Sequence, residues 1–329
     1  MPALSTHYLC GDKMLNIIKN SHEEKLITKY RQVFNLGTQG PDIFFYHNAL
    51  PWNKGQSLDY VGERLHDEKV NMFFKVALEY IKSIDSESKN ILKAYLCGYA
   101  CHYSLDTHTH PYIFYKTGFD AGDGLEHKKY SYYHRRFEAA IDVLMMDKIC
   151  NKEARRTNAS RLIKVSKDEA ETIASMYHRV FSKIFSIDIK EEEIKKAIFN
   201  MIGITSALRD TWGMKKKFIE PMERKKGNYP LISILIYPVK IHDNRDYLNL
   251  QNSLWYYPWD NCNANKKSFL QMFEEAYLES HKLTNVIFSF IDNKIPIDDA
   301  LGIIGNRSFS SGLDCDTNIK FKYFDCIFE

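Results

Sequence analysis

The sequence contains no apolar run close to the roughly 20 residues that a membrane-spanning helix needs. It also lacks a charged start followed by an apolar segment, which is the pattern of a secretory signal. Internal repeats, low-complexity segments and clear linkers are absent as well. These absences argue against a spanning or exported protein and against a repeat array. We therefore expect a cytoplasmic protein whose residues 1–329 form a single domain.

Cysteine is sparse and the charge is nearly balanced. The seven cysteines are an odd number and mostly scattered, which favours free thiols over a disulfide framework. Cys97 and Cys101 fall in one predicted helix and are expected in the core. A net charge of +3 gives no indication of a specific nucleic-acid partner. The one local basic stretch, residues 214–228, is expected to be a solvated helix face followed by a loop.

Aromatic residues, by contrast, are abundant. The chain has 21 Tyr and 20 Phe among 329 residues, which argues against disorder and predicts a large core. Residues 230–241 have strand-like content, and residues 318–329 are expected to be a final strand or an extended cover. Apolar residues recur at helical spacing elsewhere, so we predict an all-α fold with at most minor β structure near the C-terminus. The predicted helices span residues 12–30, 62–82, 86–112, 126–150, 166–187, 191–209, 212–224, 268–293 and 295–304.

The stretch of residues 94–138 carries metal-binding residue types at helical spacing. His102, Asp106 and His110 follow one another in steps of four, and His134 and Glu138 repeat that step. Residues four apart lie on one face of a helix. Imidazole nitrogen and carboxylate oxygen are both good zinc ligands, so two facing helices of this kind could share a cluster of metal ions. The apolar neighbours favour burial, and a buried aspartate needs a cationic partner.

Three earlier residues add to this candidate ligand set. His7 lies near the start of the chain, and His66 lies on the inner side of a predicted helix. Asp42 follows Pro41 at an expected helix start, where it could point back into the molecule. Taken alone, each is more simply explained as an N-cap, core or surface residue. They are included as candidate ligands because they occur together with the other members of the set.

Other residues of the same types are placed outside the ligand set. Pro111 is expected to end the helix at His110, because proline disfavours helical geometry in the residue before it. His108 belongs to another face of that helix, and His47 is expected to support the site or to pack. His127 is kept as a reserve ligand or phosphate-contacting group on the following helix.

The ordered set resembles the zinc-dependent phospholipase C family. The pattern is a histidine near the chain start, an aspartate, a histidine, H-x-x-x-D-x-x-x-H at 102–110 and H-x-x-x-E at 134–138. The phrases FNLGTQGPDIFFYH and CHYSLDTHTHPY are similar to bacterial members of that family. Related single-strand-specific nucleases share much of the pattern. The resemblance covers roughly residues 1–142 and implies an all-α fold that holds three zinc ions.

The resemblance also implies an assignment of ligands to ions. Removal of Met1 would expose the amine of Pro2 at the position where mature family members use their first residue as a ligand. Asp106 would bridge the first two ions. The remaining ligands, in the order of the ions, are Asp42, His66 and His102 for the first, Pro2 and His7 for the second, and His110, His134 and Glu138 for the third.

The chemistry implied by the resemblance is phosphodiester hydrolysis. In this reaction a zinc-bound hydroxide attacks phosphorus in line, and Asp42 could accept a proton from the attacking water. The substrate is expected to be a phosphodiester, with a phospholipid as one option. Choline-preferring members of the family use an acidic residue near the mature N-terminus and a tyrosine after the aspartate. Here residues 1–9 contain no carboxylate and Ile43 follows Asp42, so the resemblance does not imply a choline headgroup.

Two alternative functions fit the same residues. A nuclease or nucleotidase would use the same zinc cluster and would need aromatic side chains to stack bases, for which Phe44, Phe45 and Tyr46 are candidates. A non-catalytic helical protein would hold metal only structurally, with each ion closed by four protein ligands.

Overall fold

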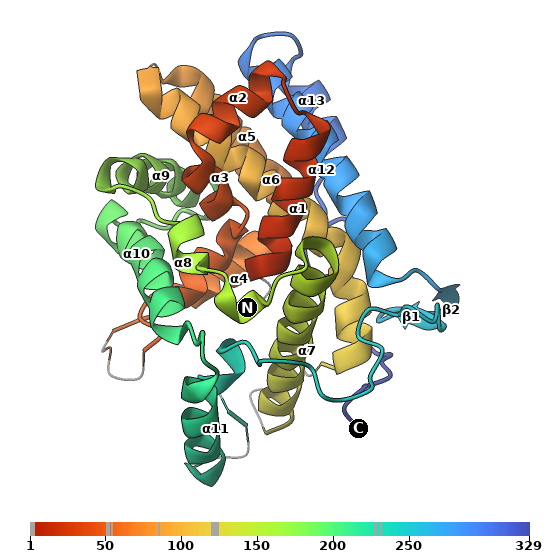
Figure 1. Cartoon of the computed structure of the whole chain (residues 1–329). Helices are drawn as coiled ribbons and strands as arrows, with labels where there is room; N and C mark the ends of the chain where they lie inside the picture. The colour runs from red at the N-terminus through yellow and green to blue at the C-terminus, as the bar shows by residue number, and fades with distance from the viewer. Residues whose placement is uncertain are drawn as a thin grey trace.

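The computed structural model describes residues 4–50, 53, 55–84, 86–119, 125–226, 229–230 and 232–329. Helices dominate the described chain and the fold is all-α, as predicted (Figure 1). The α-helices are α1 (Leu4–Ile17), α2 (His22–Lys29), α3 (Arg31–Gly37), α4 (Asp59–Asp67), α5 (Val70–Ser83), α6 (Ser86–Thr117), α7 (Leu125–Cys150), α8 (Ala159–Leu162), α9 (Lys167–Val180), α10 (Glu191–Leu208), α11 (Met214–Lys226), α12 (Phe269–Ile291) and α13 (Ile297–Ile304).

Shorter elements connect these helices. The two strands form an antiparallel hairpin in which Trp255 pairs with Asn265 and Tyr256 with Ala264. No helix in the described part of the chain is both long and apolar enough to cross a lipid bilayer. The short elements are the 3₁₀ helices η1 (Gly40–Tyr46), η2 (Ala154–Arg156) and η4 (Ser233–Leu235), the π-helical turn η3 (Phe181–Phe185), and the strands β1 (Trp255–Tyr257) and β2 (Asp260–Asn265).

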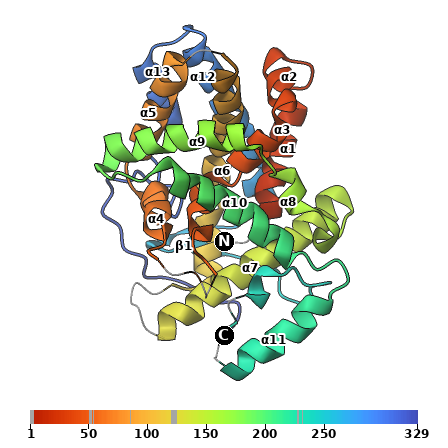
Figure 2. The ribbon, with the colours of Figure 1, turned by 90° about the vertical axis from the view of Figure 1, so that its left-hand side faces the viewer.

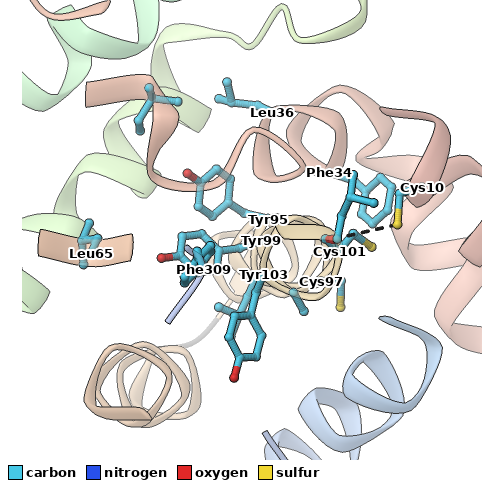
Figure 3. Packing of buried hydrophobic residues seen from close by; sticks show 14 of the residues in the cluster. Cys10, Phe34, Leu36, Leu65, Tyr95, Cys97, Tyr99, Cys101, Tyr103 and Phe309 are labelled. Atoms are coloured by element: carbon cyan, nitrogen blue, oxygen red, sulfur yellow. Dashed lines mark hydrogen bonds between the residues drawn. The ribbon is translucent and has the colours of Figure 1, made fainter. Parts of the chain in front are cut away.

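Helix α6 is the central element of the core. It packs against α1, α3, α7 and α12, and α9 and α10 cover the side seen in Figure 2, where α10 contacts η1. Looking along α6, Figure 3 shows Tyr95, Tyr99 and Tyr103 on one side and Cys97 on the other. All of these side chains are fully buried. The expectation that Cys97 and Cys101 are core residues is therefore confirmed.

Two glycines set the distance between α3 and α6. A Cβ atom on Gly37 would lie 2.1 Å from the carbonyl oxygen of Tyr95, and one on Gly98 would lie 2.1 Å from that of Phe34. Only glycine permits this approach of two backbones. The close crossing matters for the site, because it brings the chain after α3 against the face of α6 that carries His102.

The predicted end of the central helix at His110 is wrong. Helix α6 continues to Thr117 with Pro111 inside it. Proline cannot donate a hydrogen bond to the carbonyl of Thr107, and that carbonyl lies against Gly312 instead. The residue that follows, Tyr112, is fully buried and donates a hydrogen bond to the carbonyl of Tyr247 at 3.1 Å. Packing on both sides of the proline outweighs its local preference.

Two long predicted helices are divided in the structure. Residues 12–30 belong to α1 and α2, and α1 already begins at Leu4. Residues 62–82 belong to α4 and α5, which are separated at Lys69, whose φ of 53° is left-handed. Just before this break, the Asp67 carboxylate accepts hydrogen bonds from the hydroxyls of Ser308 and Ser310. These contacts with a distant segment are consistent with the break, which apolar spacing alone does not reveal.

The β structure lies elsewhere than predicted. The described part of residues 230–241 contains the 3₁₀ helix η4 and no strand, because Pro238 interrupts its apolar residues. The strands β1 and β2 form in the aromatic segment that follows. Residues 318–329 form no strand and instead cover the end of α6, where Asp325 and Ile327 donate backbone hydrogen bonds to the carbonyls of Tyr115 and Lys116.

Candidate metal centre

The structure brings together the side chains of all eight predicted ligands that it describes. They come from α1, η1, α4, α6 and α7, which meet around the C-terminal half of α6. Pro2, the ninth predicted ligand, lies outside the described residues. Ligand atoms within 4.8 Å of one another form three groups, which are His7, His102 and Asp106; Asp42, His66 and His102; and His110, His134 and Glu138.

Asp106 lies at the centre of this cluster. One carboxylate oxygen is 3.3 Å from Nε2 of His7, and the other is 3.0 Å from Nε2 of His102 and 3.7 Å from Nδ1 of His110. The aspartate side chain is only 4% exposed. The helical step of four residues therefore places His102, Asp106 and His110 on one face, as the sequence predicts.

Three of the histidines are oriented by backbone carbonyl oxygens. Nδ1 of His102 donates a hydrogen bond to Thr38 at 3.1 Å, and Nδ1 of His66 donates to Gly62 at 2.7 Å. Nδ1 of His110 donates to Phe309 at 2.9 Å. Because a carbonyl only accepts, each Nδ1 carries a proton, and each Nε2 is directed to another partner, to which it can offer its lone pair when it is not itself protonated. This is the usual orientation of metal-ligating histidines.

The second and third groups extend to either side of the central helix. Nε2 of His66 is 3.2 Å from the carboxylate of Asp42, which stands in the first turn of η1 as expected. On α7, Oε1 of Glu138 is 3.1 Å from Nε2 of His134 and 3.5 Å from Nε2 of His110 on α6. Each group thus combines imidazole with carboxylate from two different elements.

The electrostatics keep the carboxylates ionised. Burial alone raises the pKa of Asp106, but His102, His110 and His7 lower it below its ordinary range. Burial alone likewise raises the pKa of Asp42, and the hydrogen bond from His66 reverses this. Burial lowers the pKa of His7 to about 3, helped by the neighbouring His102. An ionised carboxylate beside a neutral imidazole is the state that binds zinc.

His110 differs from His7 in its charge. Burial alone lowers its pKa, but Asp106 and Glu138 together raise it to about 9. In the protein without metal, His110 is therefore a cation that neutralises part of the buried negative charge. A metal ion at this group would take the place of that proton.

A metal cluster fits this donor set. Nε2 of His102 and Nδ1 of His7 and His134 are buried and have no hydrogen-bond partner among the described residues. Buried polar atoms of this kind are rare, because each costs its full desolvation free energy. The ring of His102 is common to two of the three groups, so its buried Nε2 faces the space where their donors converge. Zinc prefers N and O donors, and an ion in this space would satisfy Nε2 of His102.

Glycine makes room for the shared histidine. Gly40 has φ of 51°, and a Cβ atom there would lie 2.4 Å from Cδ2 of the His102 ring. The turn between α3 and η1 can therefore pass directly over the imidazole. This contact couples the segment that presents Asp42 to the central helix.

The structure adds one residue that the sequence argument missed. Asp142 on α7 is fully buried and accepts hydrogen bonds from the backbone N–H groups of Ser5 at 3.0 Å and Thr6 at 2.8 Å. The hydroxyls of Thr6 and Tyr237 also donate to it. Burial raises the pKa of Asp142 to about 7, although these hydrogen bonds lower it. Asp142 follows Glu138 by another step of four, a signal that could have identified it.

Asp142 fixes the first turn of α1, which carries His7. The first N–H groups of a helix have no partner inside the helix, and here a carboxylate from another helix supplies one. When the carboxyl is ionised, its negative charge also lies at the positive end of the helix. Asp142 is therefore a positioning residue for His7.

The remaining histidines lie outside the cluster. Nε2 of His47 is 2.7 Å from the carboxylate of Glu193, and Nδ1 of His108 donates to the carbonyl of Ser104 at 2.8 Å. His127 is exposed and lies 3.5 Å from the hydroxyl of Ser131, so it belongs to none of the three groups. Leaving His47 and His108 out of the ligand set agrees with these contacts.

The fold and the cluster together define an all-α protein with a largely buried group of His, Asp and Glu side chains that could hold metal ions. Residues 6–190 match the model of the zinc-dependent phospholipase C family. Since this match covers more than half of the chain, the protein belongs to the zinc-dependent phospholipase C family. No curated protein and no solved structure matches the chain.

Proposed function

We propose that this protein is a zinc-dependent phosphodiester hydrolase whose site holds three zinc ions. The observation that carries the proposal is the convergence of three ligand groups around one face of α6, within a chain of this family. Asp42, His66 and His102 would hold the first ion. His7 and the amine of Pro2 would hold the second, with Asp106 between the two, and His110, His134 and Glu138 would hold the third.

The bound zinc would supply an activated water and positive charge for the phosphoryl oxygens. The chain's own residues set the conditions for this chemistry. Asp42 is 16% exposed, which leaves it more accessible than Asp106, and its lowered pKa keeps it ionised. It is therefore the best placed carboxylate to accept a proton from the attacking water. The carbonyls of Thr38, Gly62 and Phe309 hold the imidazoles in orientation.

A catalytic site is better supported than a structural one. A structural zinc ion is closed by four protein ligands, whereas a catalytic ion keeps a position for water. In the described part of the chain, the group on α6 and α7 offers three ligands. The side chains of His110 and His134 are 14% and 18% exposed, so the group is reached from solvent.

The nuclease alternative has weaker support from the neighbouring aromatic residues. Phe44 is fully buried and packs on Tyr177 and Phe181, so it is a core residue. Phe45 lies beside the site, with its ring 5.7 Å from that of His66, and outside the predicted set the partly buried ring of Phe114 lies 4.9 Å from that of His134. Because these two rings lie beside different ligand groups, they give only limited support for stacking of successive bases.

Metal analysis and three substrates test the proposal. We expect about three zinc ions per chain and hydrolysis of bis-p-nitrophenyl phosphate and phospholipid vesicles, but little hydrolysis of single-stranded DNA. Chelation should abolish turnover, and added zinc should restore it. Fewer than two zinc ions per chain with no turnover would refute the proposal. Preferential cleavage of DNA would establish the nuclease alternative instead.

A further inference from the structure

Helix α11, together with Trp212 two residues before it, exposes an unusual amount of apolar surface. Trp212 is 86% exposed, Phe218 65%, Met222 62% and Met214 49%. The last three follow one another in steps of four, so they lie on one face of the helix. Here these four residues are called the apolar patch. Single exposed apolar residues are common on proteins, whereas a contiguous group marks an interaction site.

The opposite face of α11 is polar and holds the helix to the protein. Nζ of Lys216 donates to the carbonyls of Ser233 and Ile236, both at 2.7 Å. The carboxylate of Glu223 accepts from the backbone N–H groups of Ile232 and Ser233, both at 2.8 Å. The helix is thus inverted relative to a normal surface helix, with polar contacts inside and apolar side chains outside.

The start of the helix is also fixed. The Asp210 carboxylate accepts a hydrogen bond from the backbone of Lys216 at 2.9 Å, and Gly213 makes the turn with φ of 72°. A Cβ atom on Gly213 would lie 2.6 Å from the Val239 side chain. The rotation of α11 about its axis is therefore determined by the fold, and the apolar patch faces solvent for structural reasons.

Basic residues flank the apolar patch. Lys217 and Lys225 are exposed, and neither forms an ion pair with any residue that the structure describes. Lys215 is exposed as well, and its ammonium group donates to the carbonyl of Ala207. Exposed aromatic and methionine side chains bordered by lysine have the composition of a helix that lies in the surface of an anionic membrane.

Helix α11 also contacts α7, the helix that carries the predicted ligands His134 and Glu138. The Arg224 guanidinium donates to the Tyr132 hydroxyl at 3.2 Å, and the ring of Tyr132 lies 5.6 Å from that of Tyr229. Tyr132 precedes the predicted ligand His134 by two residues on α7. Figure 1 shows α11 projecting at the lower end of the molecule beside α7, whereas α13 and the end of α5 lie at the opposite end.

We propose that the apolar patch docks the protein on the surface of a bilayer that contains anionic phospholipid. The positive charge of the flanking lysines favours an anionic bilayer over a second copy of the protein as the binding partner. A second copy bound through the same face would bring unpaired lysines together, whereas anionic headgroups attract them. The inference rests on the proposed function for its biological sense, because docking would present α7 to a substrate in the bilayer. Docking itself requires no turnover and can be measured separately.

Sedimentation with vesicles tests this proposal on the full, zinc-loaded chain. Vesicles of phosphatidylcholine mixed with phosphatidylserine should bind the protein at least about tenfold more tightly than vesicles of phosphatidylcholine alone. The double variant Phe218→Ser/Met222→Ser should weaken binding about tenfold or more. Leu278→Ser/Ile303→Ser, which replaces exposed apolar residues on α12 and α13, is the matched control and should bind like the parent protein.

The basic residues are tested in the same assay. Lys217→Glu/Lys225→Glu should weaken binding at least about tenfold, whereas Lys25→Glu/Lys282→Glu on α2 and α12 should have little effect. Trp212 fluorescence should shift to shorter wavelength with the mixed vesicles in the parent protein.

Two further measurements distinguish the occupants and the two proposals. Membrane docking would be overturned if the parent protein, Phe218→Ser/Met222→Ser and Lys217→Glu/Lys225→Glu bound vesicles equally. It would also be overturned if the free protein dimerised and Phe218→Ser/Met222→Ser abolished the dimer. Hydrolysis of soluble bis-p-nitrophenyl phosphate should be unchanged in the patch variants. Vesicle binding without any hydrolysis would support docking and contradict the proposed function. Hydrolysis without vesicle binding would support the proposed function and contradict docking.

Discussion

Replacing Asp142 with alanine should destabilise the protein and disturb its metal centre together. The carboxylate accepts four hydrogen bonds, from the backbone of Ser5 and Thr6 and from the hydroxyls of Thr6 and Tyr237. After truncation the hydroxyls can turn to other acceptors, but the two backbone N–H groups at the start of α1 cannot. A buried donor without a partner costs about 1–3 kcal/mol, so the loss of a partner for two donors should lower the free energy of unfolding by roughly 2–6 kcal/mol.

The assay is urea denaturation of the chelator-treated protein, because bound zinc would add its own stabilisation. Asp142→Asn retains one carbonyl oxygen and should lose roughly half as much free energy as the alanine variant. Asp147→Ala, an exposed carboxylate on the same helix, is the matched control and should change stability by less than about 0.5 kcal/mol. Asp142→Ala should also lower the zinc content of the zinc-loaded protein, because the first turn of α1 loses its hydrogen bonds and His7, which this helix carries, is then less well positioned.

The positioning argument predicts that zinc content and activity fall together in Asp142→Ala and recover partly in Asp142→Asn. If the alanine variant unfolds within about 0.5 kcal/mol of the parent protein, the hydrogen bonds to Asp142 carry no net stability and the argument is wrong. If it is destabilised but binds zinc normally, the carboxylate holds α1 without positioning His7.

Three further outcomes follow from the metal centre. Asp106→Asn should lose zinc and at least about 100-fold in activity while keeping its helical circular dichroism, and full activity would remove Asp106 from the mechanism. Gly40→Ala should lower zinc affinity more than Gly203→Ala, because a Cβ atom at Gly40 meets the His102 ring whereas Gly203 has open space. Asp106 and Glu138 raise the pKa of His110 to about 9 against the effect of burial, so zinc binding near neutral pH should release about one proton from it. Calorimetry in buffers of different ionisation enthalpy measures this proton, and zinc affinity should rise with pH up to about 9. Because the pKa of His110 is raised from 6.5 to about 9, protonation of His110 stabilises the metal-free protein. This stabilisation is fully present below pH 6.5 and should be lost as the pH rises through about 9.

The ligand face of α6 could be predicted because the period of a helix and the chemistry of its residues agree. Steps of four from His102 to His110 specify one face whatever the helix packs against. The same logic predicted His134 with Glu138, and it could have reached Asp142. Pro111 shows the limit of such reasoning. A local preference predicts a helix end, but burial of the residues around it keeps the helix intact to Thr117.

The support of the ligands could not be predicted from local pattern. His110 is oriented by the carbonyl of Phe309, which lies 199 residues further along the chain, and His102 by that of Thr38. A backbone carbonyl is present at every residue, so no residue type marks the one that a histidine will contact. Such contacts depend on how distant elements pack, and Gly37 with Gly98 controls one of them through the distance between α3 and α6.

Helix α11 shows that periodicity locates a face without giving its direction. Met214, Phe218 and Met222 are spaced like the core side of a surface helix, and the basic residues around them were expected to be solvated. The apolar face is solvated as well, and the face that packs on the protein is polar, because Lys216 and Glu223 find backbone partners in residues 232–236 and turn the apolar side outward. Exposing this surface to water costs free energy that docking on a bilayer would recover. The exposed patch is therefore better explained by an unmet partner than by the stability of the free protein.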